Sequence, residues 1–125
     1  MITTVQWLAV AVAGALGAMS RYGLGMLVGA RPFPWTTLGI NISGSFVLAF
    51  ILAGPVAERL SSTATIALTV GFLGAYTTFS TFGYETVSLV HDDRPAAAAV
   101  YVTASMLVGL AAAAAGYALG RALVD

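Results

Sequence analysis

The sequence predicts an all-α integral membrane protein with four transmembrane helices, and three observations predict it. Hydrophobic residues make up 59% of the 125 residues and charged residues only 8%, whereas about a quarter of the residues in a soluble domain are charged. The few charges leave four uncharged stretches of at least 20 residues, long enough for a helix to cross a bilayer core of about 30 Å. The hydrophobic residues run continuously rather than in alternation, which argues against the strands of a membrane β-barrel.

The composition also excludes several classes of function. Five basic residues, all arginine, balance five acidic residues, so there is no basic surface for a nucleic acid and no acidic disordered tail. There is no cysteine, and His91 is the one histidine, so neither thiolates nor a histidine cluster can bind a metal. An enzyme is therefore the least expected class.

The four expected helices, which together make one domain over residues 1–125, are 5–29, 36–54, 64–89 and 96–120. Prolines, glycines and charged residues fill the gaps between them, at 31–34, 54–59 and 91–95. The first stretch has no basic start and stays apolar past Arg21, so it does not fit a cleaved signal peptide. Four crossings place both termini on the same side of the membrane.

The arginine counts give no preferred orientation. Cytoplasmic loops usually carry an excess of Lys and Arg. Here Arg59 and Arg121 lie on the side of the termini, and Arg31 and Arg94 lie on the opposite side. Either these small numbers hide a real preference, or copies of the chain insert in both orientations and pair as antiparallel dimers.

Small residues recur at the spacing of helix-packing motifs. Gly25 and Gly29 form one GxxxG pattern, and Gly116 and Gly120 form another. Small residues let transmembrane helices approach closely where lipid supplies no hydrophobic driving force. Each pair alone fits packing within one chain, but together, in a chain of four short helices, they favour a homo-oligomer.

Polar side chains inside the expected helices require partners, because an unpaired polar group in hydrocarbon is costly. Arg21 either marks the membrane surface, attracts an anion or pairs with Glu85. Asn41 and Ser45 share a face of the second helix, and the Asn41 amide either joins helices or coordinates a passing anion. Tyr101 lies one turn before a serine of the fourth helix, a weak signal because such hydroxyls often bond their own backbone.

The third expected helix contains a segment at mid-span that favours a break. Gly71, Gly74 and the pair Thr77–Thr78 lower the helix propensity there. A break would expose main-chain carbonyls, which suit a cation, and a helix N-terminus, which suits an anion. Such backbone is tolerated at membrane depth only where it is buried in protein or lines a wet path.

Phe79 and Phe82, directly after this segment, are spaced i, i+3 and share one face of the helix. They are either ordinary lipid- or core-facing aromatics, or they line a narrow pore in which the positive edges of their rings meet a small anion. The hydroxyls of Ser80 and Thr81 would add donors beside them. The second alternative predicts an ion pathway next to the break.

In this order, the strings GALGAMSRY, TTLGINISGSF and GFLGAYTTFSTFGYE resemble the fluoride channels of the Fluc (CrcB) family. The resemblance covers three of the four helices by motif and the whole chain by length and hydropathy. It implies passive, selective export of fluoride across the inner (plasma) membrane. It also implies an antiparallel homodimer of four-helix subunits inserted in both orientations, with two pores and a structural sodium ion at its centre.

The resemblance further implies a role for each matching residue. The sodium ion would be bound by the main-chain carbonyls of Gly74 and Thr77, in the break of the third helix. The fluoride pathway would be lined by amide, aromatic and hydroxyl side chains: Asn41, Phe79, Ser80, Thr81, Phe82, Tyr101 and Ser105. Arg21 would lie near the vestibule, and Glu85 corresponds to the acidic residue after the phenylalanines. The pair Ala75–Tyr76 departs from the family pattern, in which we expect small or aliphatic residues within the break.

Two other functions fit a small four-helix membrane protein. A small multidrug exporter also inserts both ways, but its proton exchange needs an acidic residue deep in a span, and Glu85, late in the third helix, is the one candidate. A non-transporting assembly subunit would explain the GxxxG pairs but not a polar break followed by two phenylalanines. The residues therefore favour the channel, with fluoride, the lipid bilayer and a second copy as partners.

Overall fold

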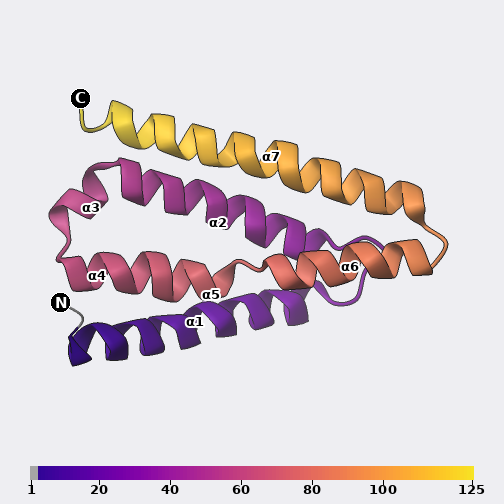
Figure 1. Ribbon diagram of the computed structural model, residues 1–125, viewed down its shortest axis with the longest axis horizontal. Coiled ribbons are helices and arrows are strands. Elements are labelled where there is room, and N and C mark those ends of the chain that lie inside the picture. The colour runs from indigo at the N-terminus through magenta and orange to yellow at the C-terminus, as the bar shows by residue number, and fades with distance from the viewer. Residues whose placement is uncertain (1–2) are drawn as a thin grey trace.

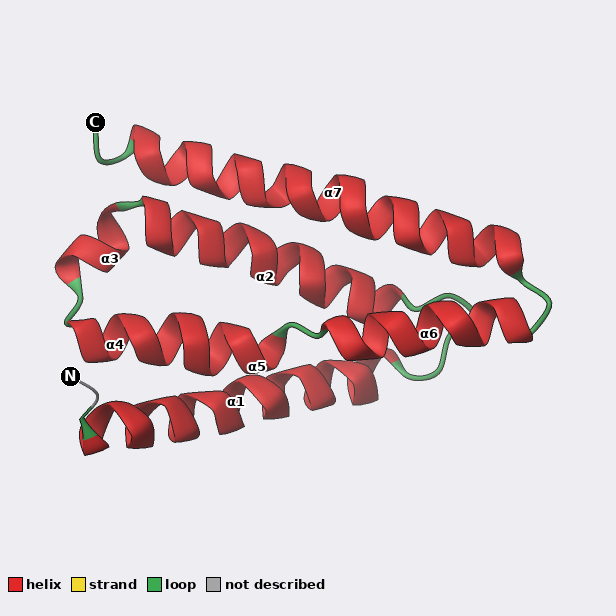
Figure 2. Cartoon of the chain, viewed as in Figure 1, coloured by secondary structure: helices red, strands yellow, loops and turns green. Residues whose placement is uncertain are grey.

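The computed structural model describes residues 3–125, which are almost entirely helical (Figures 1 and 2). In chain order the elements are α1 (Thr4–Val28), α2 (Trp35–Ala53), α3 (Pro55–Arg59), α4 (Ser62–Ile66), the π-helix η1 (Ala67–Leu73), α5 (Gly74–Tyr76), α6 (Phe79–His91) and α7 (Pro95–Ala122). Within the described chain, four segments are long and apolar enough to cross a membrane: Thr4–Val28, Trp35–Ala53, Ser62–His91 and Pro95–Ala122. The predicted all-α fold with four candidate membrane spans is therefore confirmed.

Local sequence signals set the helix ends. The Thr3 hydroxyl accepts a hydrogen bond from the Gln6 amide, and the Gln6 side chain accepts one from the Thr3 amide, both at 3.2 Å. This reciprocal capping satisfies two of the free amides at the start of α1. Gly29 ends α1 with a φ of 72°, and prolines occupy the first turns of α3 and α7. The ends of the spans therefore follow from the residues that flank them.

The long elements run side by side along one axis, and both termini lie at the same end of the molecule (Figure 1). α7 packs along α2, while α1 packs along η1 and α5. The third span consists of α4, η1, α5 and α6, and its last part contacts α7. This arrangement places the middle of the third span against α2.

Glycines allow the closest contact between helices. A Cβ atom on Gly116 would lie 2.2 Å from the carbonyl oxygen of Phe46, and one on Gly120 would lie 2.8 Å from that of Phe50. These distances are too short for a side chain, so α7 packs directly on the main chain of α2. Gly25, in the other GxxxG pattern, has no atom within 4 Å of the corresponding position. The pattern of Gly116 and Gly120 is therefore explained by packing within one chain, which removes one of the reasons for expecting a homo-oligomer.

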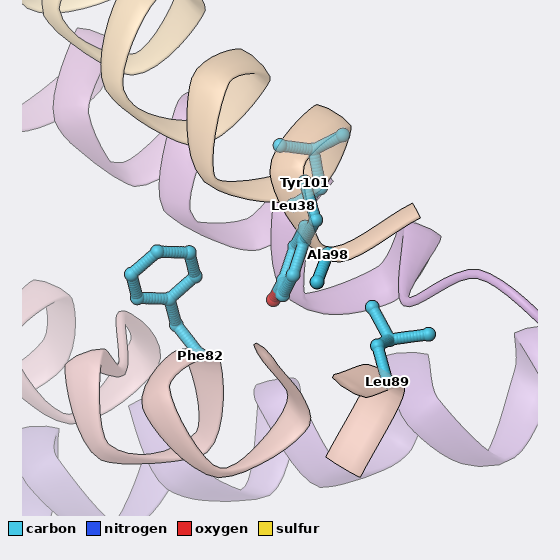
Figure 3. Close-up of a cluster of buried hydrophobic side chains, with 5 residues drawn as sticks. All are labelled: Leu38, Phe82, Leu89, Ala98 and Tyr101. Atoms are coloured by element: carbon cyan, nitrogen blue, oxygen red, sulfur yellow. The ribbon is translucent and has the colours of Figure 1, made fainter. Parts of the chain in front are cut away.

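A small buried cluster joins α2, α6 and α7, and it comprises Leu38, Phe82, Leu89, Ala98 and Tyr101 (Figure 3). The Tyr101 ring is fully buried, and its centroid lies 5.1 Å from that of Phe82 in an edge-on arrangement. Outside this cluster the spans bury few of their residues. In α1, only 6% of the most apolar stretch is buried. Helices that are apolar on their exposed faces suit a surrounding of lipid or of another apolar helix.

Replacing Gly116 by Ala should destabilise the fold, because the added methyl group would overlap the Phe46 carbonyl oxygen. Overpacking of this kind costs roughly 1–3 kcal/mol, so the unfolding temperature in detergent should fall. Gly109→Ala is the matched control in the same helix, because no atom lies within 4 Å of its Cβ position. Equal unfolding temperatures for the two variants would contradict the close contact between α2 and α7.

Candidate functional site

Two extended residues interrupt the third span between α5 and α6. Thr77 has φ −79° and ψ 156°, and Thr78 has φ −151° and ψ 117°. The helix restarts because the Thr78 hydroxyl accepts a hydrogen bond from the Thr81 amide at 3.2 Å and caps α6. The predicted break is therefore present, and Figure 2 shows it as the loop between α5 and α6. The π-helix η1, an element that often accompanies functional sites, lies just before it.

Asn41 of α2 supplies the hydrogen bonds that the break removes. Its side-chain oxygen accepts from the Thr78 amide at 2.8 Å, and its Nδ2 donates to the Thr78 carbonyl oxygen at 3.0 Å. An extended residue loses its intrahelical partners, and the interior of a bilayer offers no water to replace them. Of the two alternatives for Asn41, the structure shows the one in which it joins helices. Its second Nδ2 hydrogen remains for another acceptor.

α2 also approaches the break closely. A Cβ atom on Gly44 would lie 2.3 Å from the methyl carbon of Thr77 and 3.4 Å from the ring of Tyr76. The Ser45 hydroxyl donates to the carbonyl oxygen of Asn41 at 2.7 Å, so it remains folded back on its own helix. The face of α2 between Asn41 and Ser45 is therefore the surface on which the break rests.

The break leaves main-chain carbonyls at the end of α5. The Thr77 amide and hydroxyl both donate to the Leu73 carbonyl oxygen at 3.0 Å. The Arg21 Nε donates to the Ala75 carbonyl oxygen at 3.2 Å. Among residues 3–125, no donor reaches the carbonyl oxygens of Gly74 and Thr77. Free carbonyls at an unwound point of a membrane helix are the kind of ligand that binds a monovalent cation.

A hollow of about 270 Å³ lies beside the break. Its lining includes four side chains expected in the ion pathway, from three helices: Asn41, Phe79, Phe82 and Ser105. The ring centroids of Phe79 and Phe82 are 5.7 Å apart. Phe79 is 77% exposed, whereas Phe82 is 7% exposed and belongs to the buried cluster. The structure thus brings the predicted amide, aromatic pair and one hydroxyl together around one space.

Three other predicted pathway residues lie outside this hollow. The Ser80 side chain is exposed, with its Oγ 3.4 Å from that of Thr78. Thr81 lines a separate hollow of about 420 Å³ between α1 and α2, together with Arg21. Tyr101 is buried in the core beside Phe82. Of the predicted pathway residues, four therefore line one hollow and Thr81 lines another, while Ser80 and Tyr101 line neither.

The interpretation of Arg21 as a partner of Glu85 is wrong. Glu85 accepts hydrogen bonds from the hydroxyls of Thr37, at 2.6 Å, and Tyr101, at 3.4 Å. Arg21 instead donates to the Ala75 carbonyl oxygen. The reason is geometric, because Glu85 faces α2 and α7, whereas Arg21 reaches the end of α5 from α1.

Three residues make hydrogen bonds at the site that the sequence analysis did not predict: Thr37, Tyr76 and Thr78. A threonine at the start of an apolar run is a recognised helix-capping signal, so Thr78 was open to prediction. Thr37 and Tyr76 gave no such signal, because their hydrogen-bond partners lie 48 and 33 residues away in the sequence.

Comparison with known proteins shows which family this chain resembles along most of its length. Residues 8–117 match the family model described as CrcB-like protein, Camphor Resistance (CrcB). The chain is 45% identical over 123 residues to a fluoride-specific ion channel FluC of Thermus thermophilus, which covers 95% of this chain and 98% of the relative. It is 41% identical over 127 residues to a fluoride-specific ion channel FluC of Geobacter sulfurreducens, with 98% and 100% covered. Both similarities extend over all four candidate spans.

Replacing Asn41 by Ala should destabilise the break, because the Thr78 amide and carbonyl would both lose their partner. Leaving such groups unpaired costs roughly 1–3 kcal/mol, which thermal unfolding in detergent would detect. Ser45→Ala, one turn along the same face, removes only a bond within α2 and is the control. An Asn41→Ala variant as stable as the control would contradict the bridging role of the amide.

Proposed function

This chain belongs to the CrcB-like family, whose relatives are named fluoride-specific ion channels, and we propose that it conducts fluoride passively through the hollow beside the break. The chain is thus a multi-pass membrane protein of a channel family and not of an enzyme family. One observation carries the proposed pathway: the Asn41 amide, the Ser105 hydroxyl and the rings of Phe79 and Phe82 converge on one space.

The chemistry of this lining suits a small, strongly hydrated anion. The second N–H of Asn41 and the hydroxyl of Ser105 can donate hydrogen bonds in place of water. The edges of the two phenylalanine rings are their positive parts, and they attract an anion weakly. Several weak sites let an ion enter the pore and leave it again. The lining therefore offers fluoride a replacement for its hydration shell without a site that would trap it.

The residues outside the hollow extend the proposed pathway. Arg21 and Thr81 line the neighbouring hollow, where a guanidinium beside hydroxyl groups would raise the local concentration of an anion. Ser80 lies at the exposed start of α6, with its hydroxyl 3.4 Å from that of Thr78, a residue that lines both spaces. Tyr101 acts through Phe82, because its buried ring holds that phenylalanine edge-on at 5.1 Å. Glu85 in turn holds the Tyr101 hydroxyl.

A structural sodium ion at the centre of a dimer belongs to the same proposal. The carbonyl oxygens of Gly74 and Thr77 fit such an ion, because no donor in the described chain occupies them. Two oxygens are fewer than a cation normally takes, so the matching pair from a second copy would complete the set. When bound, the ion would supply a fixed positive charge that favours anions nearby.

An antiparallel arrangement of two copies in the plasma membrane, with one pore beside each break, accounts for two further observations. Phe79 lines the hollow but is 77% exposed, so the pathway of a single chain is open on one side and a second copy would close it. Four of the five arginines are shared equally between the two ends of the spans, which supports insertion in both orientations.

Liposomes containing the purified protein should release fluoride, and not chloride, when the membrane potential is clamped to zero. A fluoride electrode and a chloride electrode would measure the two fluxes. Phe79→Ile should lower the flux by about tenfold or more, because one ring edge of the pathway is lost. Its unfolding temperature should stay near that of the wild type, since Phe79 is exposed.

Phe50→Ile is the matched control, because that ring stacks on Phe46 within α2 and lies outside the lining of the hollow. Absence of fluoride flux from the wild type would refute the channel. Undiminished flux through Phe79→Ile would refute only the aromatic lining.

Insertion in both orientations can be tested with a single thiol, because the chain contains no cysteine. In intact cells, a membrane-impermeant maleimide should label about half of Asp125→Cys copies, as equal insertion requires. Asp92→Cys, at the opposite end of the spans, should give the same fraction. Complete labelling of one variant and none of the other would establish a single orientation and contradict the antiparallel dimer.

A further inference from the structure

Tyr76, one of the two residues at which the break departs from the expected small or aliphatic type, contacts α2 with its ring and its hydroxyl. Its ring stacks on Phe72, with centroids 5.9 Å apart and planes inclined by 18°. The same ring passes over Gly44, where a Cβ atom would lie 3.4 Å from it. Its hydroxyl lies 3.0 Å from the Oγ of Ser43. The last residue of α5 is therefore held at its ring and at its hydroxyl.

The direction of the hydrogen bond between Tyr76 and Ser43 follows from the other bond that Ser43 makes. The Ser43 hydroxyl donates its one hydrogen to the carbonyl oxygen of Ile40 at 3.1 Å. Both bonds form together when the Tyr76 hydroxyl donates and the Ser43 hydroxyl accepts, since Ser43 has only one hydrogen to donate. A directed chain results, from the Tyr76 hydroxyl through Ser43 to the main chain of α2.

Three successive residues around the break are thus each held by α2. Ser43 holds Tyr76, Gly44 admits the Thr77 methyl group, and Asn41 pairs with the main chain of Thr78. The first of these contacts is the one on the α5 side of the break. The free carbonyls of Gly74 and Thr77 belong to the residues two before and one after Tyr76.

From this geometry we infer that Tyr76, bonded to Ser43, is a positioning residue that fixes the two free carbonyls and thereby sets the affinity of the cation site. The inference rests on the sodium ion of the proposed function. A cation that binds mobile carbonyls must order them at a cost in free energy, and a site that is already ordered avoids this cost. The hydroxyl of Tyr76 touches no ion and acts only through the main chain that carries its ring.

Sodium binding can be measured without ion flux, as the rise of the unfolding temperature in detergent when sodium replaces N-methylglucamine at constant ionic strength. Tyr76→Phe keeps the ring and removes the hydroxyl. The dissociation constant for sodium, fitted to the rise of the unfolding temperature with sodium concentration, should increase roughly two- to tenfold, as expected for one lost hydrogen bond between membrane helices. Ser43→Ala should give a similar increase, and the double variant should be no worse than either single variant.

Two control variants remove the same groups elsewhere. Tyr117→Phe changes an exposed tyrosine of α7, and Ser20→Ala removes a hydroxyl that bonds only the carbonyl oxygen of Leu16, one turn back in α1. Both should keep the wild-type dissociation constant for sodium. The inference is overturned if Tyr76→Phe lowers the unfolding temperature without sodium but leaves this dissociation constant unchanged, or if the effects of Tyr76→Phe and Ser43→Ala on it simply add. If sodium does not raise the unfolding temperature of the wild type, both the proposed sodium site and this inference are refuted. The fluoride flux of the wild type would still test the proposed channel.

Discussion

The pairing of the Asn41 amide with the main chain of Thr78 makes a broken helix compatible with a bilayer. A helix is normally required at membrane depth because it satisfies its own polar groups. Here one side chain of a neighbouring helix takes over both partners of an extended residue. The restart of α6, the free carbonyls of α5 and the hollow lined by Phe79 all lie next to that residue. The pairing therefore helps to hold all three in place.

The spans and the break were open to prediction because the bilayer imposes simple rules. Uncharged stretches gave spans whose ends lie within two residues of the observed ends, and the Thr77–Thr78 pair marked the interruption. The positions of Arg21 and Tyr101 were not accessible in the same way, because their partners are chosen by packing between distant segments. The motif of Gly116 and Gly120 shows the same limit, since a small-residue pattern does not reveal whether its partner helix is in the same chain.

The two phenylalanines that follow the break have different surroundings. Phe82 is held by Tyr101, whose hydroxyl is held by Glu85, which also binds Thr37. Its orientation is therefore fixed by a chain of contacts that spans three helices, of which Figure 3 shows the residues Phe82 and Tyr101. Phe79 has no comparable support within the single chain and is open on its outer side. The Phe82 ring is thus a fixed part of the wall of the hollow, whereas the Phe79 ring is open to whatever surrounds the chain.

The π-helix η1 precedes the break and affects how the break is turned about the axis of the third span. η1 is anchored on α1 by glycine contacts, because a Cβ atom on Gly17 would lie 2.1 Å from the carbonyl oxygen of Phe72. A seven-residue π-helix has a wider turn than an α-helix, so it shifts the phase of everything that follows it. A π-turn contains one residue more than an α-turn, so loss of a single residue from η1 would restore α-helical hydrogen bonding with little rotation of Thr78 about the axis of the third span.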